Sequence, residues 1–335
     1  MKKWKVLLLT VLIGGLLLLG VSSFAETKPV KDISVFFIVK ASGSYYWQIM
    51  MNGAQLAAKD LGIHITFQEP VNEADISQEV AILNDAIAEH PDAIVIAPSV
   101  TDALTAGIVK AMSEGIKVII VDSAANTDDY VTFTCSNNYE AGKELAKEFV
   151  DLIKAKTHQA TPTGDIAYET DTAGAQWSVE RDGGFLAGLK EYAPNLKIVA
   201  HTVPMNSLET STTQWQNIFT AHPNLVGVFA DNNNTGDGLA RALQLSGMAG
   251  KLVAVAFDND PAELTALSQG ILNALMIQEP WNEGYNSVFY AVEAVEGVQM
   301  PKIIYTPTTL VLQSTLNNPE AQAVINPIEF HKNWK

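Results

Sequence analysis

Clusters of carboxylate, amide and aromatic side chains recur along the sequence directly after short apolar runs. They occupy residues 42–47, 122–123, 231–234, 258–260 and 278–281. Carboxylates accept hydrogen bonds from vicinal hydroxyl groups, amides both donate and accept them, and aromatic faces cover the apolar C–H face of a sugar ring. This combination predicts binding of a neutral, hydroxyl-rich ligand if the fold gathers the clusters on one surface.

Each polar cluster also has a structural interpretation. Asp260 and Glu263 have the spacing of a capping box, so we interpret Asp260 as a helix cap. The asparagines at 232–234 include the cap of the following helix, which leaves one or two of them for a ligand. Asp122 suits a turn as well as a ligand contact. Asp258 comes directly at the end of an apolar run, before the cap, and there ligand contact is favoured.

The aromatic residues have two interpretations as well. Tyr45, Tyr46 and Trp47 are adjacent at the start of a predicted helix, so they cannot all face the core and at least one should line a cleft. Trp177 fits either stacking on a ligand or burial against a sheet. Cys135, the only cysteine, lies in an alternating strand-like run and is predicted to be a small buried core residue.

Signatures of the common enzyme classes are absent from the sequence. It contains no G-x-S-x-G, H-E-x-x-H, P-loop or G-x-G-x-x-G motif and no paired cysteines, and its six histidines lack the spacing of metal ligands. We therefore expect no enzyme activity, no cofactor and no metal. The alternative is a sugar hydrolase or lyase that uses Asp122 and Asp258 as an acid/base pair.

Composition and charge narrow the choice of partners. The chain has 335 residues, 47% of them hydrophobic, which excludes intrinsic disorder and suits two domains. It carries 21 Lys and Arg against 37 Asp and Glu, a formal net charge of -16, and only two of the cations are arginines, Arg181 and Arg241. Nucleic acids and anionic membranes are unsuitable partners, because neutralising their phosphates requires clustered cations, which this sequence lacks.

The first 25 residues have the pattern of a secretory signal peptide. Lysines at positions 2, 3 and 5 precede the apolar run 6–19, and a small-x-small cleavage site ends at Ala25. We expect cleavage after about Ala25 and export to the periplasm. No cysteine stands at the cleavage point, so a lipoprotein anchor is not expected, and the mature protein is expected to be a monomer.

Apolar strand-like runs alternate with helical patterns along the rest of the chain. In the first half, strands are expected near 33–39, 63–67, 93–96 and 118–121, with helices near 44–61, 74–89 and 102–113. In the second half, strands are expected near 165–168, 197–202, 226–229, 252–257, 272–277 and 310–312, with helices between them. Strands separated by single helices must be parallel, so the fold class is α/β, with two doubly wound parallel-sheet domains.

Several of these segments together resemble the ribose-binding-protein group of periplasmic sugar-binding proteins. The resemblance is carried, in the family's order, by residues 43–47 with 52–54, 180–185, 221–223 with 228–232, 255–258 and 278–280. It implies two Rossmann-like domains joined by a three-segment hinge, which close over a ligand and dock on the membrane permease of an ABC importer. The implied domains are 32–136 with 279–308 and 137–278 with 309–335.

The resemblance also implies which residues contact the ligand. The family's stacking aromatics fall on Tyr45 and Tyr46, and its polar contacts fall on Asp122, Asn232, Asp258 and the hinge residue Gln278. Trp177 lies near these positions and is added as a stacking candidate. Two family arginines are replaced, by Ser123 and at about Val179. We therefore expect a pocket that keeps its carboxylates, loses these two cations and favours a neutral monosaccharide or polyol, which argues against ribose itself.

An alternative ligand follows from Lys40. The related autoinducer-2 and rhamnose binders also carry a lysine after the first strand, but the other autoinducer contacts do not match. A protein that presents a sugar-like signal to a membrane sensor instead of a permease therefore remains the second interpretation. The extension 314–335 is expected either to pack along a domain face or to be partly disordered.

Overall fold

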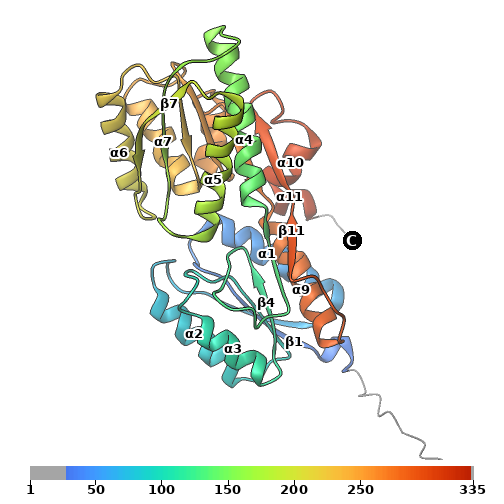
Figure 1. The fold of residues 1–335 in the computed structure, drawn as a ribbon. Coiled ribbons are helices and arrows are strands. Elements are labelled where there is room, and N and C mark those ends of the chain that lie inside the picture. The colour runs from blue at the N-terminus through green and yellow to red at the C-terminus, as the bar shows by residue number, and fades with distance from the viewer. Residues whose placement is uncertain (1–27, 333–335) are drawn as a thin grey trace, which may run out of the picture.

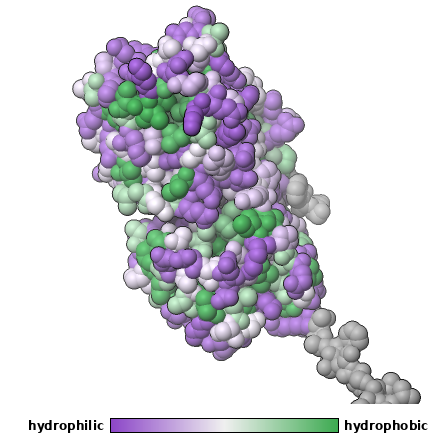
Figure 2. Space-filling model, in the orientation of Figure 1, coloured by the Kyte–Doolittle hydropathy of each residue, from purple (hydrophilic) through white to green (hydrophobic). Residues whose placement is uncertain are grey.

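The computed structural model describes residues 28–332 and contains two α/β domains stacked end to end (Figure 1). The expected signal peptide and its cleavage site after Ala25 lie outside the described residues. Within residues 28–332, no helix is long and apolar enough to cross a membrane. Figure 2 shows the two domains as separate lobes that meet at a narrower waist, with hydrophilic residues over much of both lobes.

The first domain is built on a six-stranded sheet with the order β11-β5-β4-β3-β1-β2, in which all neighbouring strands are parallel. Its strands are β1 (Ser34–Ile38), β2 (His64–Gln68), β3 (Ala93–Ile96), β4 (Lys117–Val121), β5 (Thr132–Ser136) and β11 (Ile303–Thr306). Its helices are α1 (Tyr45–Leu61), α2 (Ile76–Ala88), α3 (Thr105–Ser113) and α9 (Pro280–Val295), after a 3-10 turn at Val30–Asp32.

The second domain repeats this plan with the order β12-β10-β9-β8-β6-β7, and only the β10–β12 pair is antiparallel. Its strands are β6 (Gly164–Glu169), β7 (Leu196–Thr202), β8 (Gly227–Ala230), β9 (Val253–Phe257), β10 (Ala274–Gln278) and β12 (Thr308–Leu312). Its helices are α4 (Asn138–Thr157), α5 (Gln176–Tyr192), α6 (Leu208–Ala221), α7 (Asn233–Leu245), α8 (Pro261–Ser268) and α10 (Pro319–Ile325). The predicted α/β class with two doubly wound sheets is confirmed.

The chain passes between the two domains three times. It crosses after β5 into α4, after β10 into α9, and between β11 and β12. Figure 1 shows the consequence for α9, which follows second-domain strands in the sequence but packs beside α1 in the first domain. Three crossings allow the domains to move relative to each other mainly by hinge motion. The resemblance in the sequence implied such a three-segment hinge.

Helix α9 and helix α4 pack closely on helices of their own domains through glycines. A Cβ atom at Gly53 of α1 would lie 2.1 Å from the backbone oxygen of Trp281 in α9, and one at Gly184 of α5 would lie 1.9 Å from that of Tyr139 in α4. Both positions therefore require glycine for close backbone approach. These two contacts attach each crossing helix to the domain that it enters.

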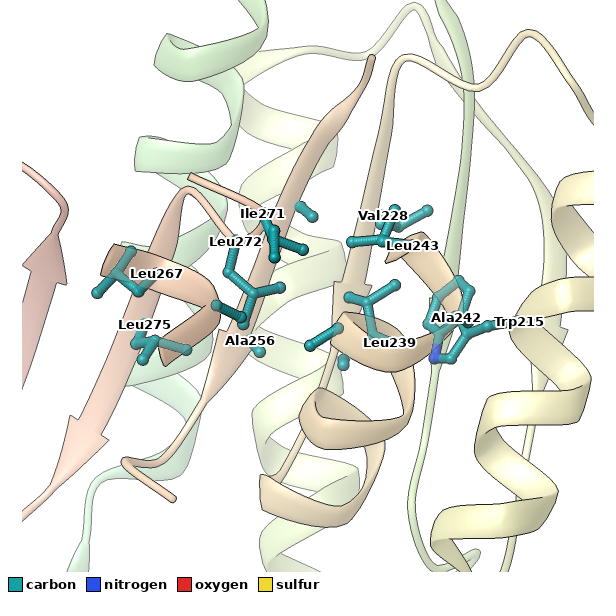
Figure 3. Packing of buried hydrophobic residues seen from close by; sticks show 14 of the residues in the cluster. Trp215, Val228, Leu239, Ala242, Leu243, Ala256, Leu267, Ile271, Leu272 and Leu275 are labelled. Carbon is teal, nitrogen blue, oxygen red and sulfur yellow. The ribbon is translucent and has the colours of Figure 1, made fainter. Parts of the chain in front are cut away.

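Apolar side chains fill both faces of each sheet. Figure 3 shows one such cluster, in which Leu239 and Leu243 of α7 pack with Val228 of β8 and Trp215 of α6. Cys135 belongs to the core of the first domain and is 4% exposed, as predicted, and burial raises the pKa of its thiol. The sheets are thus rigid supports for the loops at their strand ends.

The C-terminal extension packs along the second domain and then reaches the hinge. Val324 and Ile325 of α10 join that domain's core, and the Asn259 side chain donates hydrogen bonds to both of their backbone oxygens, at 2.8 and 3.4 Å. The short helix α11 (Pro327–His331) lies against α1, and His331 stacks on Trp281 at the start of α9, with ring centroids 3.8 Å apart. The first alternative, packing along a domain face, is therefore the one observed for residues 314–332.

Candidate ligand-binding site

Two aspartates occupy equivalent positions in the two domains. Asp122 follows β4 and Asp258 follows β9, the corresponding strand of the second sheet. Both have left-handed backbone angles, φ 65° and 79°, and each donates its backbone N–H to the neighbouring strand, to Thr134 and Met276, at 2.9 Å. The left-handed turn ends each strand and directs the carboxylates toward the space between the domains.

Asp122 is held by three side chains of its own domain. The Tyr46 hydroxyl donates to Oδ1 at 2.9 Å, while Lys40 Nζ and the Ser123 hydroxyl donate to Oδ2 at 2.8 and 2.6 Å. Burial alone would raise the pKa of Asp122, but the charge of Lys40 and these hydrogen bonds outweigh it and hold the pKa below its usual value. Asp122 is therefore an ionised, fixed hydrogen-bond acceptor at neutral pH.

Asp258 has a different environment. Gln278 Nε2 donates to its Oδ1 at 2.7 Å, and the backbone N–H of Asn233 donates to Oδ2 at 3.1 Å. Burial raises the pKa of Asp258 more than the charge of Arg181 and these two hydrogen bonds lower it. Gln278 is the last residue of β10, where the chain crosses between domains, so the hinge directly contacts this carboxylate.

A cavity of about 410 Å³, counting its opening to solvent, lies between these groups and is here called the inner cavity. Its wall comes from both domains and consists of Lys40, Ser44, Tyr46, Trp47, Glu73, Asp122, Trp177, Arg181, Asn232, Asn233, Asp258 and Gln278. Six of the seven residues predicted from the sequence are in this wall. The exception is Tyr45, which lines an adjoining cavity of about 850 Å³, here called the outer cavity.

Two of the predicted residues have part of their surface engaged elsewhere. The Asn232 side-chain oxygen accepts the backbone N–H of Thr235 at 3.1 Å and caps α7, so only its amide nitrogen faces other partners. Trp177 is half-buried and lines a third cavity, of about 540 Å³, as well as the inner one. Neither the capping role nor partial burial removes these side chains from the inner cavity wall.

Two cations line the inner cavity, Lys40 and Arg181, neither of them at the positions of the two replaced family arginines. Arg181 is 2% exposed, donates to the backbone oxygen of Asp231 at 2.5 Å and to the Asn138 side chain at 2.9 and 3.2 Å, and lies 4.0 Å from the centre of the Phe257 ring. Lys40 is paired with Asp122. Each cation thus already has partners within the protein.

Sequence reasoning also missed Glu73 and gave no specific role to Trp47. Trp47 Nε1 donates to Glu73 Oε1 at 2.7 Å, and Lys40 Nζ lies 5.1 Å from the centre of the Trp47 ring. Glu73 stands in an irregular loop between β2 and α2, where no motif marks it. For Trp47 the signal was present, since three adjacent aromatics required at least one to line a cleft.

A polar cavity between two hinged α/β domains, walled by strand ends of both sheets, defines a protein that encloses a small polar molecule. A model of the periplasmic binding protein domain matches residues 35–299. The chain therefore belongs to the periplasmic binding protein family.

The relatives of this chain are sugar-binding proteins of transporters, so the resemblance expected from the sequence is confirmed. A carbohydrate transporter solute-binding protein of Agrobacterium radiobacter, solved with D-arabinose, is 31% identical with a TM-score of 0.83, covering 88% of this chain and 99% of its own. An ABC transporter solute-binding protein of Agrobacterium vitis, solved with D-fucose, is 31% identical with a TM-score of 0.80, covering 87% and 99%. A ribose import binding protein of Salmonella typhimurium is 27% identical, covering 83% of this chain and 90% of its own.

Proposed function

We propose that this protein captures a neutral sugar or polyol in the inner cavity and delivers it to the permease of an ABC importer. The observation that carries the proposal is the composition of the cavity wall, in which carboxylates, amides and aromatic rings from both domains face one space. Hydroxyl groups of the ligand donate to Asp122 and Asp258 and accept from the Asn232 amide, and Tyr46 and Trp177 cover its C–H faces.

Capture proceeds by hinge closure in this proposal. The two moving bodies are residues 32–136 with 279–308 and residues 137–278 with 309–326, and α11 bridges them through its contacts with α1 and Trp281. A ligand that touches Asp122 on one side and Asp258 on the other binds the closed arrangement more tightly than the open one, and so shifts the population toward it. Gln278, which lies at a crossing and contacts Asp258, connects ligand contact to hinge position.

The charges of the wall support a neutral ligand. Lys40 forms an ion pair with Asp122, and Arg181 is occupied by Asp231 and Asn138, so neither cation is available to hold an anionic group without losing its present partners. The relatives also support it, since the two solved Agrobacterium proteins carry D-arabinose and D-fucose.

Binding without turnover is part of the same proposal. A hydrolase or lyase would need Asp122 or Asp258 to exchange a proton with the substrate. Both oxygens of Asp122 already accept hydrogen bonds from the protein, and Lys40 stabilises the ionised form, which favours a fixed acceptor over a proton carrier.

The mature protein acts outside the cytoplasmic membrane as an exported monomer.

A thermal-shift screen tests the proposal. Purified mature protein is heated with monosaccharides, polyols, charged amino acids and nucleosides, each in large excess. A ligand at about 100 times its Kd adds roughly 2.7 kcal/mol of stability, enough for a clear rise in Tm. A rise with a neutral sugar or polyol supports the proposal, and a rise only with charged amino acids or nucleosides contradicts it.

A further inference from the structure

Tyr45 is the one predicted ligand contact that the inner cavity does not explain. Tyr45 and Tyr46 are successive residues at the start of α1 and point about 100° apart. Tyr46 reaches Asp122 in the inner cavity, whereas Tyr45 lines the outer cavity. The outer cavity shares Ser44, Glu73 and Asn233 with the inner one, so the two spaces adjoin each other.

The outer cavity has side chains of the same chemical types as the inner one, and again they come from both domains. The first domain contributes Tyr45, Asn72 and Glu73 with Ala41, Gly43, Ser44 and Val71, and the second contributes Asn206, Asn233, Asn234 and Asp260. None of these described lining residues is a lysine or arginine. Four amides, two carboxylates and an aromatic ring form a wall that suits hydroxyl groups and gives an anion no partner.

Asp260 presents an acceptor to this space. Its Oδ2 accepts the Asn233 side-chain amide at 3.1 Å, and Asp260 forms a capping box with Glu263 at the start of α8, as the sequence predicted, with Oδ1 buried away from the cavity. A carboxylate oxygen has two lone pairs, so Oδ2 can accept a ligand hydroxyl beside the Asn233 amide. Tyr45 of the first domain and Asp260 of the second line the same cavity, and burial together with the Asp260 carboxylate raises the pKa of Tyr45.

We propose that the outer cavity is a second sugar subsite, so that the preferred ligand is a disaccharide or a glycoside with a hydroxylated second unit rather than a single ring. One ring occupies the inner cavity between Asp122 and Asp258. The second unit lies against Tyr45 and donates a hydroxyl to Asp260. This inference rests on the proposed sugar-binding function and specifies the size of its ligand.

Isothermal titration calorimetry with matched sugars tests the inference. The probes are D-glucose with maltose and cellobiose, D-galactose with lactose and melibiose, and D-xylose with xylobiose, together with free D-arabinose, D-ribose and D-allose. We expect one disaccharide to bind about ten-fold more tightly than any of these monosaccharides, because one stacked ring and one hydrogen bond to a carboxylate are added.

Variants locate the second unit. In Tyr45→Ala and in Asp260→Asn the ratio of monosaccharide Kd to disaccharide Kd should fall toward one. Tyr305→Ala is the matched control, because Tyr305 is 57% exposed on β11 and lines none of the three cavities, and it should leave the ratio unchanged. Folding of each variant is checked by its urea unfolding midpoint.

The possible failures are distinguishable. If a monosaccharide binds as tightly as every disaccharide, or if the Tyr45 and Asp260 variants keep the full ratio, the outer cavity is only an entrance and the inference is wrong while sugar binding stands. If no probe of either size binds but a charged amino acid or nucleoside does, the proposed function itself is wrong.

Discussion

The charge on Asp258 should determine ligand affinity from the second-domain side of the inner cavity. We choose Asp258→Asn because asparagine tolerates the left-handed backbone at φ 79°, where alanine would be strained. The substitution keeps the shape of the side chain and replaces one acceptor oxygen with a donor. It removes the carboxylate that Gln278 and the Asn233 backbone hold in place.

The magnitude follows from the number of bonds lost. A hydrogen bond to a charged group contributes about 1.5–3 kcal/mol, and one ligand hydroxyl would lose such an acceptor. At about 1.4 kcal/mol for each factor of ten, the Kd should rise roughly 10-fold to 150-fold. The apo protein should remain folded, since the side chain keeps its volume in a buried site.

Calorimetry with the sugar found in the thermal-shift screen measures the change. Asp129→Asn is the control, because Asp129 is exposed in a loop of the first domain and lines none of the three cavities. Wild-type affinity in Asp258→Asn, with a normal unfolding midpoint, would refute the placement of a ligand hydroxyl on this carboxylate.

Three further predictions concern stability. Gly53→Ala should lower the free energy of unfolding, measured in urea, by about 1–3 kcal/mol, because its Cβ would overlap the Trp281 backbone. The control Gly43→Ala should change it little, since a Cβ there has nothing within 4 Å. Equal effects of the two variants would contradict the account of α1–α9 packing. Burial raises the pKa of Glu169 to about 8, well above its unfolded value, so between pH 5 and pH 8 the native state retains a proton that the unfolded state releases. The urea unfolding midpoint should therefore fall from pH 5 to pH 8, and it should fall less in Glu169→Gln. An identical pH profile in the variant would argue against this role of Glu169. Asn259→Ala removes two hydrogen bonds to α10, so hydrogen exchange of residues 319–331 should accelerate, and unchanged exchange would show that this side chain does not anchor the C-terminal segment.

The sheets were predictable because their strands are buried and apolar. The run 93–96 is fully buried in β3, as a strand covered on both faces must be, and it was predicted with its observed bounds. Strand β11 was missed for the opposite physical reason. It lies at a sheet edge, two of its four residues are exposed, and its apolar run is only three residues long before Thr306 and Pro307.

The site was predictable where a residue stands at a strand end and unpredictable where its role depends on a partner far along the chain. Asp122 and Asp258 each follow a buried strand, so the topology placed both at the carboxyl ends of their sheets, and the arrangement of the domains brings them to one cavity. The pairing of Lys40 with Asp122 joins residues 82 positions apart, and Arg181 reaches Asp231 across 50, which no local pattern encodes. The separation of Tyr45 from Tyr46 required the exact start of α1, which sequence patterns locate only within a few residues.

The central claim is that a neutral sugar lies between the two domains. The most direct measurement is a crystal structure of the mature protein with the sugar that raises its Tm most. The account predicts density for a sugar ring in the inner cavity, within hydrogen-bond distance of Asp122 on one domain and Asp258 on the other. A sugar bound elsewhere, or one that contacts a single domain with the inner cavity left to water, would contradict it.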